Sequence, residues 1–377
     1  MIMKTVYTVI LSAMTFNMTS CASSSDKNVV PEIKEAIASK ALTKTNKRTI
    51  EYSLKNFHGI RNNSNVDIVF KHEKEYSVKV TADETTLKRL MVEVKSGILD
   101  ISTLNISTEK GRNSDKAYLE ISTPELSVIH NNGIADIKAG KLDNSKMNIE
   151  NNGIINLIID EIKTNDCSIH NNGQGNIKTT TVVCKLLDYE NSGVDKFTAS
   201  IQADNVRIEN NGQEKTNLSI EAKKIGVENN GSMSADIKLN ADAVKIDNSG
   251  IFKITDGNIT CLTLSYENNG SGIFNGRTNA NDVDIDNSGI MTTENNIKAT
   301  KMKIGNNGTL KGKIDFKGEE ADIENYGIGN ITVNTDCTTL NAHNNGSASL
   351  KITGTADRTK IEGNGQSKID TKELNKF

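Results

Sequence analysis

The sequence has no tryptophan, only two prolines and 4% aromatic residues, and its charges almost cancel. With 45 basic against 48 acidic residues, the formal net charge is −3, so no cationic excess exists to bind nucleic acid. The scarcity of proline excludes a proline-rich disordered chain. A hydrophobic content of 35% over 377 residues argues against a thick core with helices. It favours a thin fold in which each strand gives only alternate side chains to the interior.

The N-terminus has an apolar stretch, residues 6–16, that is too short to span a bilayer as a helix. It follows Lys4, and small residues lead from it to Cys21, which predicts a secretion signal over residues 1–21. The ending on cysteine resembles the lipoprotein signal of bacteria, in which that cysteine is lipidated. The resemblance implies a lipid anchor at Cys21 and a place in the cell envelope, with the outer membrane expected. An ordinary signal peptide with an incidental cysteine is the alternative.

Residues 22–47 are polar and poorly patterned, apart from a short helix expected near residues 31–41. Such a segment is typical of a flexible tether between an anchor and a folded body.

A triplet Asn-(Asn/Ser/Tyr)-Gly recurs through most of the remaining sequence. Its glycines are Gly133, Gly153, Gly173, Gly193, Gly212, Gly231, Gly250, Gly270, Gly289, Gly308, Gly327 and Gly346, and a degenerate copy ends at Gly365. Successive glycines are 19 or 20 residues apart, which indicates a repeat architecture. Below, each residue of a repeat is numbered from its own glycine at position 0, and the residues that share a position form a column.

The columns alternate in polarity. Position −4 is mostly isoleucine, as in Ile129 and Ile149, position −6 is mostly Val, Leu or Met, and position +4 is often apolar. Steps of two residues predict strands with these positions on one face. Each repeat is therefore expected to contain two short strands, one before and one after the triplet.

Two folds could use this unit. Asn-Gly is a strong hairpin signal, so an antiparallel meander has to be considered. A meander would need a second, equally regular turn in each repeat. A single corner at a fixed period instead predicts an all-β, single-stranded, right-handed parallel β-helix with about 13 coils, whose equivalent residues stack about 4.8 Å apart. The corner glycines are expected in the left-handed backbone conformation.

Position −2 has the same parity as the buried positions, so its asparagine is expected to point inward. The predicted structural ladder of buried amides, each bonded to the next, consists of Asn131, Asn151, Asn171, Asn191, Asn210, Asn229, Asn248, Asn268, Asn287, Asn306, Asn325 and Asn344. Such a ladder satisfies buried amides without water.

The other four cysteines are Cys167, Cys184, Cys261 and Cys337. Three of them share position −9, but Cys184 and Cys261 are four coils apart, about 19 Å, which is beyond the reach of a disulfide. Cys167 occupies a different column. All four are expected to be small buried side chains.

Residues 48–130 show strand patterning without the triplet and are expected to form irregular N-terminal coils that cap the stack. A polar segment, residues 106–116, interrupts them. Residues 131–370 would form the regular coils, and residues 371–377 a C-terminal tail or cap.

The segments Phe57–Ile60, Asn65–Phe70, Leu99–Ile101 and Leu119–Leu126, followed by the glycine repeats, resemble the putative auto-transporter adhesin, head GIN domain family. The resemblance covers about residues 48–370. It implies a β-helical bacterial envelope protein, often a lipoprotein, with an adhesive role. The regular triplet series here is longer than in that pattern and suggests a repeat-expanded member.

Position −3 carries the one unusual surface, a column of acidic residues. A cation or a cationic partner could bind the run Glu190, Glu209, Glu228, Asp247, Glu267 and Asp286, with Ca²⁺ as the cofactor to consider. The sequence favours a simpler interpretation, a solvated face whose charges are offset by lysines at +3. His130, His170 and His343 also occupy position −3 and are expected to face outward, without zinc-site spacing.

No catalytic, phosphate-binding or dinucleotide-binding motif is present in the sequence. An enzyme on this scaffold would need long loops that build a pocket, and the repeat is hardly interrupted after Gly133. The sequence therefore predicts a non-enzymatic surface protein that binds a glycan or an envelope protein through flat faces. A β-helical enzyme acting on polysaccharide is the alternative, and a purely architectural spacer is a third interpretation.

Overall fold

The computed structural model describes residues 47–104, 116–364 and 368–376 and is nearly all β-structure. The expected signal peptide, Cys21, the tether and its helix lie outside the described residues, as does all of the polar segment except Lys116. All of the described residues belong to one compact unit. No helix in the described part of the chain is long and apolar enough to cross a bilayer.

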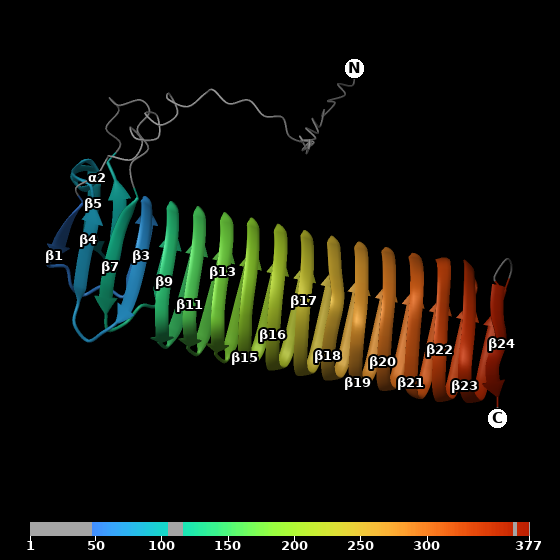
Figure 1. Ribbon diagram of the computed structural model, residues 1–377. Helices are drawn as coiled ribbons and strands as arrows, with labels where there is room; N and C mark the ends of the chain where they lie inside the picture. Colours follow the sequence, from blue (N-terminus) through green and yellow to red (C-terminus); the bar gives the residue numbers. More distant parts are fainter. Residues whose placement is uncertain (1–46, 105–115, 365–367, 377) are drawn as a thin grey trace, which may run out of the picture. The chain divides into compact units, whose positions relative to one another are not determined.

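From Val128 onward the chain winds into a β-solenoid, and the whole unit has about 13 turns (Figure 1). Each strand pairs in parallel with the strand of the next coil. Ile149, for example, lies beside Ile129 on one side and Ile169 on the other. This pairing confirms the parallel β-helix and rules out the antiparallel meander.

The first regular coils each contain two strands, as the sequence predicted. They are β8 (Val128–Asn131), β9 (Ile134–Asp143), β10 (Lys146–Asn151), β11 (Ile154–Lys163), β12 (Asp166–Asn171), β13 (Gln174–Val183) and β14 (Leu186–Asn191). The coils that end at Gly153, Gly173 and Gly193 have 20 residues, and a second corner interrupts their strands.

Beyond Gly193 the expectation of two strands per repeat is wrong, because one strand runs from each triplet to the next. These strands are β15 (Val194–Asn210), β16 (Gln213–Asn229), β17 (Ser232–Asn248), β18 (Ile251–Asn268), β19 (Ser271–Asn287), β20 (Ile290–Asn306), β21 (Thr309–Asn325), β22 (Ile328–Asn344) and β23 (Ser347–Gly363). Most of these coils have 19 residues and turn the second corner without interruption. The 20-residue coil that ends at Gly270 accommodates its extra residue in a bulge between Ile254 and Gly257.

The corner glycines do not adopt the predicted left-handed conformation. Among the described glycines, positive φ values occur at Gly97, Gly276, Gly329 and Gly354, none of which is a corner. Glycine is required at the corners because the neighbouring coil leaves no room for a Cβ atom. A Cβ on Gly231 would overlap the carbonyl oxygen of Gly212 in the preceding coil, and each corner glycine from Gly153 to Gly346 has the same close neighbour.

The asparagines at position −2 are buried, and eleven side-chain hydrogen bonds of 2.5–2.9 Å connect them in series. Asn229 is typical: its Nδ2 donates to Oδ1 of Asn248 at 2.8 Å and to the main-chain oxygen of Ile251 at 2.9 Å. The series therefore joins the interiors of successive coils.

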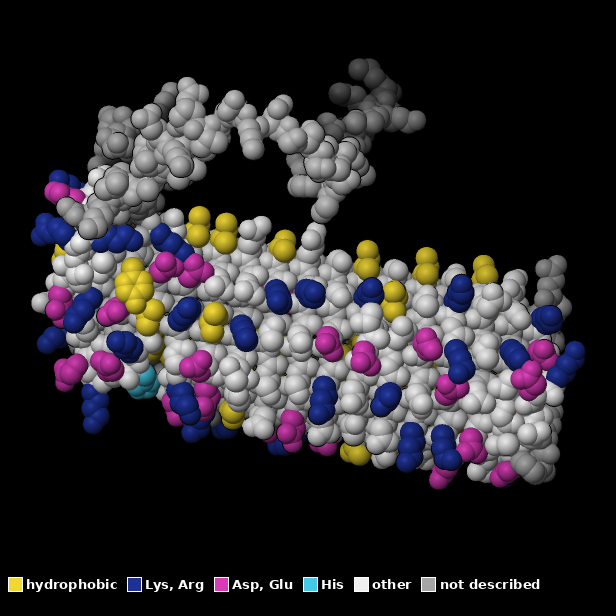
Figure 2. Space-filling view, viewed as in Figure 1, with side chains coloured by type: hydrophobic (Ala, Val, Ile, Leu, Met, Phe, Trp, Pro, Cys, Tyr) yellow, Lys and Arg dark blue, Asp and Glu magenta, His cyan; other side chains and the backbone are white. Residues whose placement is uncertain are grey.

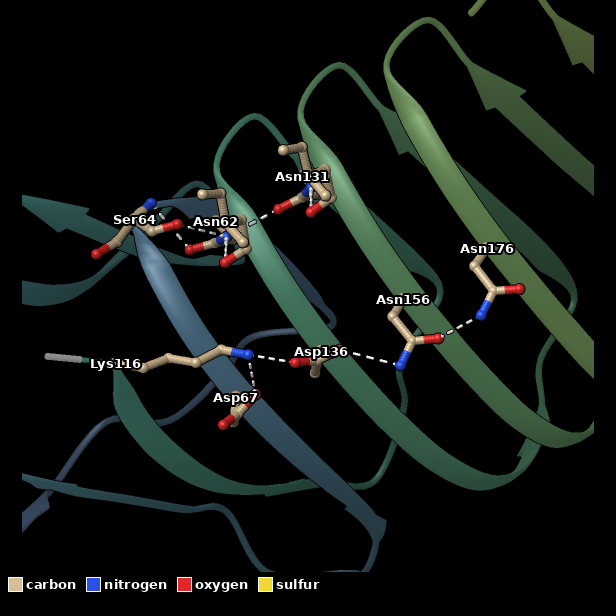
Figure 3. A network of polar contacts seen from close by, with 10 residues as sticks. Asn62, Ser64, Asp67, Lys116, Asn131, Asp136, Asn156 and Asn176 are labelled. Carbon is tan, nitrogen blue, oxygen red and sulfur yellow. Dashed lines mark hydrogen bonds and ion pairs between the residues drawn. The ribbon is translucent and has the colours of Figure 1, made fainter. Parts of the chain in front are cut away.

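The ladder begins one coil earlier than the triplets suggested, at Asn62, which donates to Asn131 at 2.8 Å (Figure 3). Ser64 takes the place of the corner glycine there, and its carbonyl oxygen lies against Gly133. Residues 65–127 then intervene before the next coil, so the period could not reveal this first member.

The N-terminal end combines coil strands with an antiparallel cap. Its elements are β1 (Arg48–Tyr52), β2 (Gly59–Asn63), β3 (Asn65–His72), β4 (Ser77–Ala82), α2 (Glu84–Arg89), β5 (Leu90–Lys95), β6 (Ile98–Thr103) and β7 (Ala117–Thr123). Strands β2 and β3 pair in parallel with β8 and β9. In contrast, β4 is antiparallel to β1 and β7, and β5 is antiparallel to β6, so these strands are not simple coils.

Helix α2 was not predicted. Its N-cap is Asp83, whose side chain accepts a hydrogen bond from the main-chain N–H of Thr86. At the other end of the solenoid, β24 (Lys368–Lys376) pairs in parallel with β23, so most of the predicted tail belongs to a last, partial coil.

Candidate binding face

The residues at positions −7, −5 and −3 form one outer side of each coil, between the second corner and the triplet. Their side chains are exposed or half-buried, while those at −6, −4 and −2 point into the core. We call this side of the solenoid, over the coils that end at Gly193 to Gly327, the binding face. It contains the acidic column and an adjacent groove.

The structure places the six predicted acidic residues, Glu190 to Asp286, at equivalent positions on successive coils. Several carboxylates have partners at neighbouring positions of their own coil. Glu209 is paired with Arg207 and accepts from Asn211 at 2.8 Å, and Asp247 is 2.7 Å from Nζ of Lys245. Asparagines at −1 also donate to Glu228 and Glu267.

The lysines at +3 are not the partners of these six carboxylates in the described structure. They lie beyond the triplet corner, and the cations that contact the column are at −5 instead. Within the described residues, no three His, Cys, Asp or Glu side chains are grouped so that they could hold a metal ion. Four of the six carboxylates, those of Glu209, Glu228, Asp247 and Glu267, thus have a hydrogen-bond or ion-pair partner, and the column is a line of separate groups rather than a convergent site.

The histidines of this column are half-buried rather than fully outward. His130 Nε2 is 3.6 Å from Glu150, and His343 Nδ1 is 3.4 Å from Glu362, while His170 contacts the hydroxyl of Ser168 at 3.2 Å. They therefore form local polar contacts on separate coils.

Beside the acidic column lies an elongated groove of about 650 Å³, which we call the axial groove. Equivalent residues of six successive coils line it, so it runs along the solenoid axis, across the strands, for about 24 Å at a rise of about 4.8 Å per coil. Its first coil contributes Lys224 and Gly226, and its last contributes Glu320 and Asp322.

Short side chains line part of the groove, over its first three coils. Arg207 occupies position −5 in the coil before it, and Gly226 is its neighbour in the next coil. Ala243, Thr263 and Ser265 continue the two columns with small groups. The −6 residues between the columns, such as Leu264, have buried side chains, so they contribute their main chain to the floor.

The charged groups of the groove balance one another. Four lysines (Lys224, Lys245, Lys301, Lys303) face four carboxylates (Asp282, Asp284, Glu320, Asp322). Lys301 and Glu320 form an ion pair at 3.0 Å. Partial burial raises the pKa of Asp284, the nearby charge of Asp286 raises it further, and Lys303 opposes the shift. The groove has no excess of either sign.

Another side of the solenoid has a different chemistry. Position +1 carries an interrupted row of exposed aliphatic side chains, 46–60% accessible, which Figure 2 shows along the upper edge: Ile134, Ile154, Val194, Ile251, Ile290 and Ile328. Polar residues such as Ser232 and Ser271 separate them. At +3, Asp67, Asp136, Asn156 and Asn176 form a polar row anchored by Lys116 (Figure 3).

The core contains an acidic cluster that the sequence did not predict. Asp195 and Glu214 lie at +2 on neighbouring coils, both are buried, and both contact the hydroxyl of Tyr189 at 2.7 Å. Burial raises the pKa of Asp195 to about 6. Burial, together with the charge of Asp195, raises the pKa of Glu214 to about 8. The sequence could have indicated this cluster, because position +2 has the same parity as the buried positions −4, −2 and +4.

The four cysteines of the described residues are free thiols. Cys167, Cys261 and Cys337 are buried, as expected, but Cys184 is only partly buried. Burial raises the pKa of Cys184 to about 11, which disfavours its reactive thiolate.

The chain belongs to the putative auto-transporter adhesin, head GIN domain family, whose model matches residues 56–219 and 278–376. This result confirms the family suggested by the sequence pattern. The unmatched segment between the two matched ones contains the first coils of the axial groove.

Solved structures that match the chain include a putative adhesin from Parabacteroides distasonis ATCC 8503 (13% identity, 86% of this chain and 98% of that chain, TM-score 0.32). Others are a putative adhesin from Bacteroides fragilis NCTC 9343 (15%, 86% and 96%, TM-score 0.20) and a putative lipid binding protein from P. distasonis (13%, 89% and 98%, TM-score 0.25). The comparison with curated proteins found no match.

Proposed function

We propose that the protein is a non-enzymatic surface lipoprotein of the cell envelope that binds its partner through the binding face. The observation that carries this proposal is the continuity of that face: equivalent outward positions repeat on successive coils, and no long loop interrupts residues 134–363 to build an enclosed pocket. Membership of an adhesin family supports the same role. The solenoid would act in adhesion or as a scaffold.

A binding screen combined with a degradation assay tests this function. The purified solenoid is applied to a glycan array and to immobilised envelope proteins, and in parallel it is incubated with the same polysaccharides. We expect retention on a ligand without release of new reducing ends. Release of products would instead favour the alternative of a β-helical enzyme, and silence in both assays would favour a spacer.

For export and anchoring, the proposal assigns a signal peptide to residues 1–21, lipidation to Cys21 and a tether to residues 22–47. Metabolic labelling with a clickable palmitate tests it in the wild type and in Cys21→Ala. We expect label and membrane association in the wild type alone. Equal labelling of both proteins would contradict the anchor and leave the binding function to be judged separately.

A further inference from the structure

We propose that the axial groove binds an internal segment of a neutral, linear glycan that lies parallel to the solenoid axis. This inference rests on the proposed binding function and specifies its ligand and its site.

The direction of the groove selects an extended polymer. Six coils contribute to it in series, from Lys224 and Gly226 to Glu320 and Asp322, so it is long and shallow rather than deep. A compact ligand would leave most of it empty. The groove also runs across the strands, so an extended peptide inside it could not add to the sheet by main-chain pairing.

The repeat of the groove suits a polymer of sugar units. Each coil advances about 4.8 Å and presents a new pair of side chains at −7 and −5. This advance is comparable to the length of one pyranose unit in an extended β-linked chain. Successive sugars would therefore meet successive pairs, such as Thr263 and Ser265 on one coil and Asp282 and Asp284 on the next.

The charge balance argues for a neutral chain. Four lysines and four carboxylates line the groove, and the cross-coil ion pair of Lys301 with Glu320 is already formed. A polyanion would meet the carboxylates, and a polycation would meet the lysines. Sugar hydroxyls, in contrast, can donate to carboxylates and accept from ammonium groups, while the methylene stems of lysine and the carbon atoms of Gly226 and Ala243 offer apolar contact.

The test is calorimetric titration of the solenoid with cellohexaose, xylohexaose and mannohexaose, with cellobiose as a short chain. Hexa-galacturonate serves as an anionic probe and hexa-glucosamine as a cationic probe. We expect at least one neutral hexasaccharide to bind, cellobiose to bind much more weakly because it spans fewer coils, and salt to have little effect. Stronger, salt-sensitive binding of a charged probe would overturn the proposal.

The matched variants are Ser265→Arg, which fills the middle of the groove, and Ser234→Arg, which places the same side chain at +3, outside it. Neither residue is buried, so both variants should fold, which circular dichroism verifies. We expect Ser265→Arg to weaken hexasaccharide binding by about tenfold or more, equal to 1.4 kcal/mol, and Ser234→Arg to leave it unchanged.

The outcomes separate the two proposals. Equal binding by Ser265→Arg and wild type would overturn the groove and leave the binding function intact, since the ligand would then contact another surface. Failure of every neutral probe would also overturn the groove proposal. If the array and envelope-protein screens were silent too, the binding function itself would fail.

Discussion

The hydroxyl oxygen of Tyr189 lies 2.7 Å from Oε2 of Glu214, a residue of a different coil, and both side chains are buried. The same hydroxyl is 2.7 Å from Oδ2 of Asp195. A tyrosine hydroxyl has one proton, so it can donate to only one of the two carboxyl groups. The other carboxyl group has to be protonated and donate to the tyrosine. The core of the solenoid therefore holds an acidic proton.

This proton makes stability depend on pH. The folded pKa of Glu214 is about 8 and that of Asp195 about 6, both above their ordinary values of 4.5 and 3.8. The folded state thus holds protons that the unfolded state releases, and unfolding becomes easier as pH rises. The stabilisation is fully present below about pH 4 and is lost as pH rises through about 8, with a slope of at most about 1.4 kcal/mol per pH unit for each proton.

Glu214→Gln should remove part of this slope, because its amide can donate to Tyr189 at any pH. We expect the variant to gain stability relative to the wild type between pH 6 and 8, measured as the difference in melting temperature across that range. The exposed Glu221→Gln is the control and should follow the wild type. Parallel curves for Glu214→Gln and wild type would contradict the buried proton.

Asn229→Ala should interrupt the buried ladder. The change leaves Nδ2 of Asn210 without its acceptor and Oδ1 of Asn248 without its donor. We expect a loss of about 2–4 kcal/mol, since unpaired buried polar groups are costly. Hydrogen exchange should show faster exchange centred on the adjacent coils.

Asn211→Ala is the matched control, because it removes the same kind of side chain at position −1, where the asparagine is exposed. Its loss should stay within about 0.5 kcal/mol. Similar destabilisation by both substitutions would show that burial of the amide series is not what stabilises the coils.

Gly231→Ala should be strongly destabilising although no special backbone angle is involved. The added Cβ would overlap the carbonyl oxygen of Gly212, so two coils would have to separate. We expect a cost of about 3 kcal/mol or more. Chemical denaturation followed by circular dichroism measures it.

Gly226→Ala is the control for this glycine argument, because its nearest neighbour would be 4.0 Å away, at the carbonyl oxygen of Val206. A stabilisation of about 0.4–1 kcal/mol is expected from reduced freedom of the unfolded chain. A comparable loss in both variants would show that the close approach of the Gly212 carbonyl is not the reason for the cost at Gly231.

Calcium should not change the melting temperature at millimolar concentration. Several carboxylates of the acidic column already have partners: Glu209 contacts Asn211 and Arg207, Glu228 and Glu267 accept from asparagines at −1, and Asp247 is paired with Lys245. Differential scanning fluorimetry with and without calcium measures this. A rise of several degrees that disappears in Glu228→Gln would establish a cation site along the column.

The sequence predicted the coils well because a single glycine period carried the information. Ile149, Asn151 and Gly153 each belong to a column whose members have the same surroundings in every coil. The alternation of the columns along a strand was therefore enough to predict which side chains point inward. Asn62 was missed because Ser64 replaces the glycine and the antiparallel cap separates it from Asn131.

The axial groove was less predictable. It depends on the absence of large side chains at Gly226, Ala243 and Ser265, and small outward residues carry no periodic signal. The role of the corner glycines was misjudged for a similar reason. The sequence gives the preference of a residue for a backbone angle, but the carbonyl that lies against Gly231 comes from another coil and is visible only in the fold.

The stacked corners have an evolutionary consequence. Since each corner rests on an equivalent one, an entire unit of 19 residues can be inserted or deleted without creating a new kind of contact, and the solenoid lengthens or shortens by about 4.8 Å. The family model leaves residues 220–277 unmatched, which corresponds to about three such units. Unequal recombination within the gene could thus adjust how far the protein reaches, one fixed step at a time.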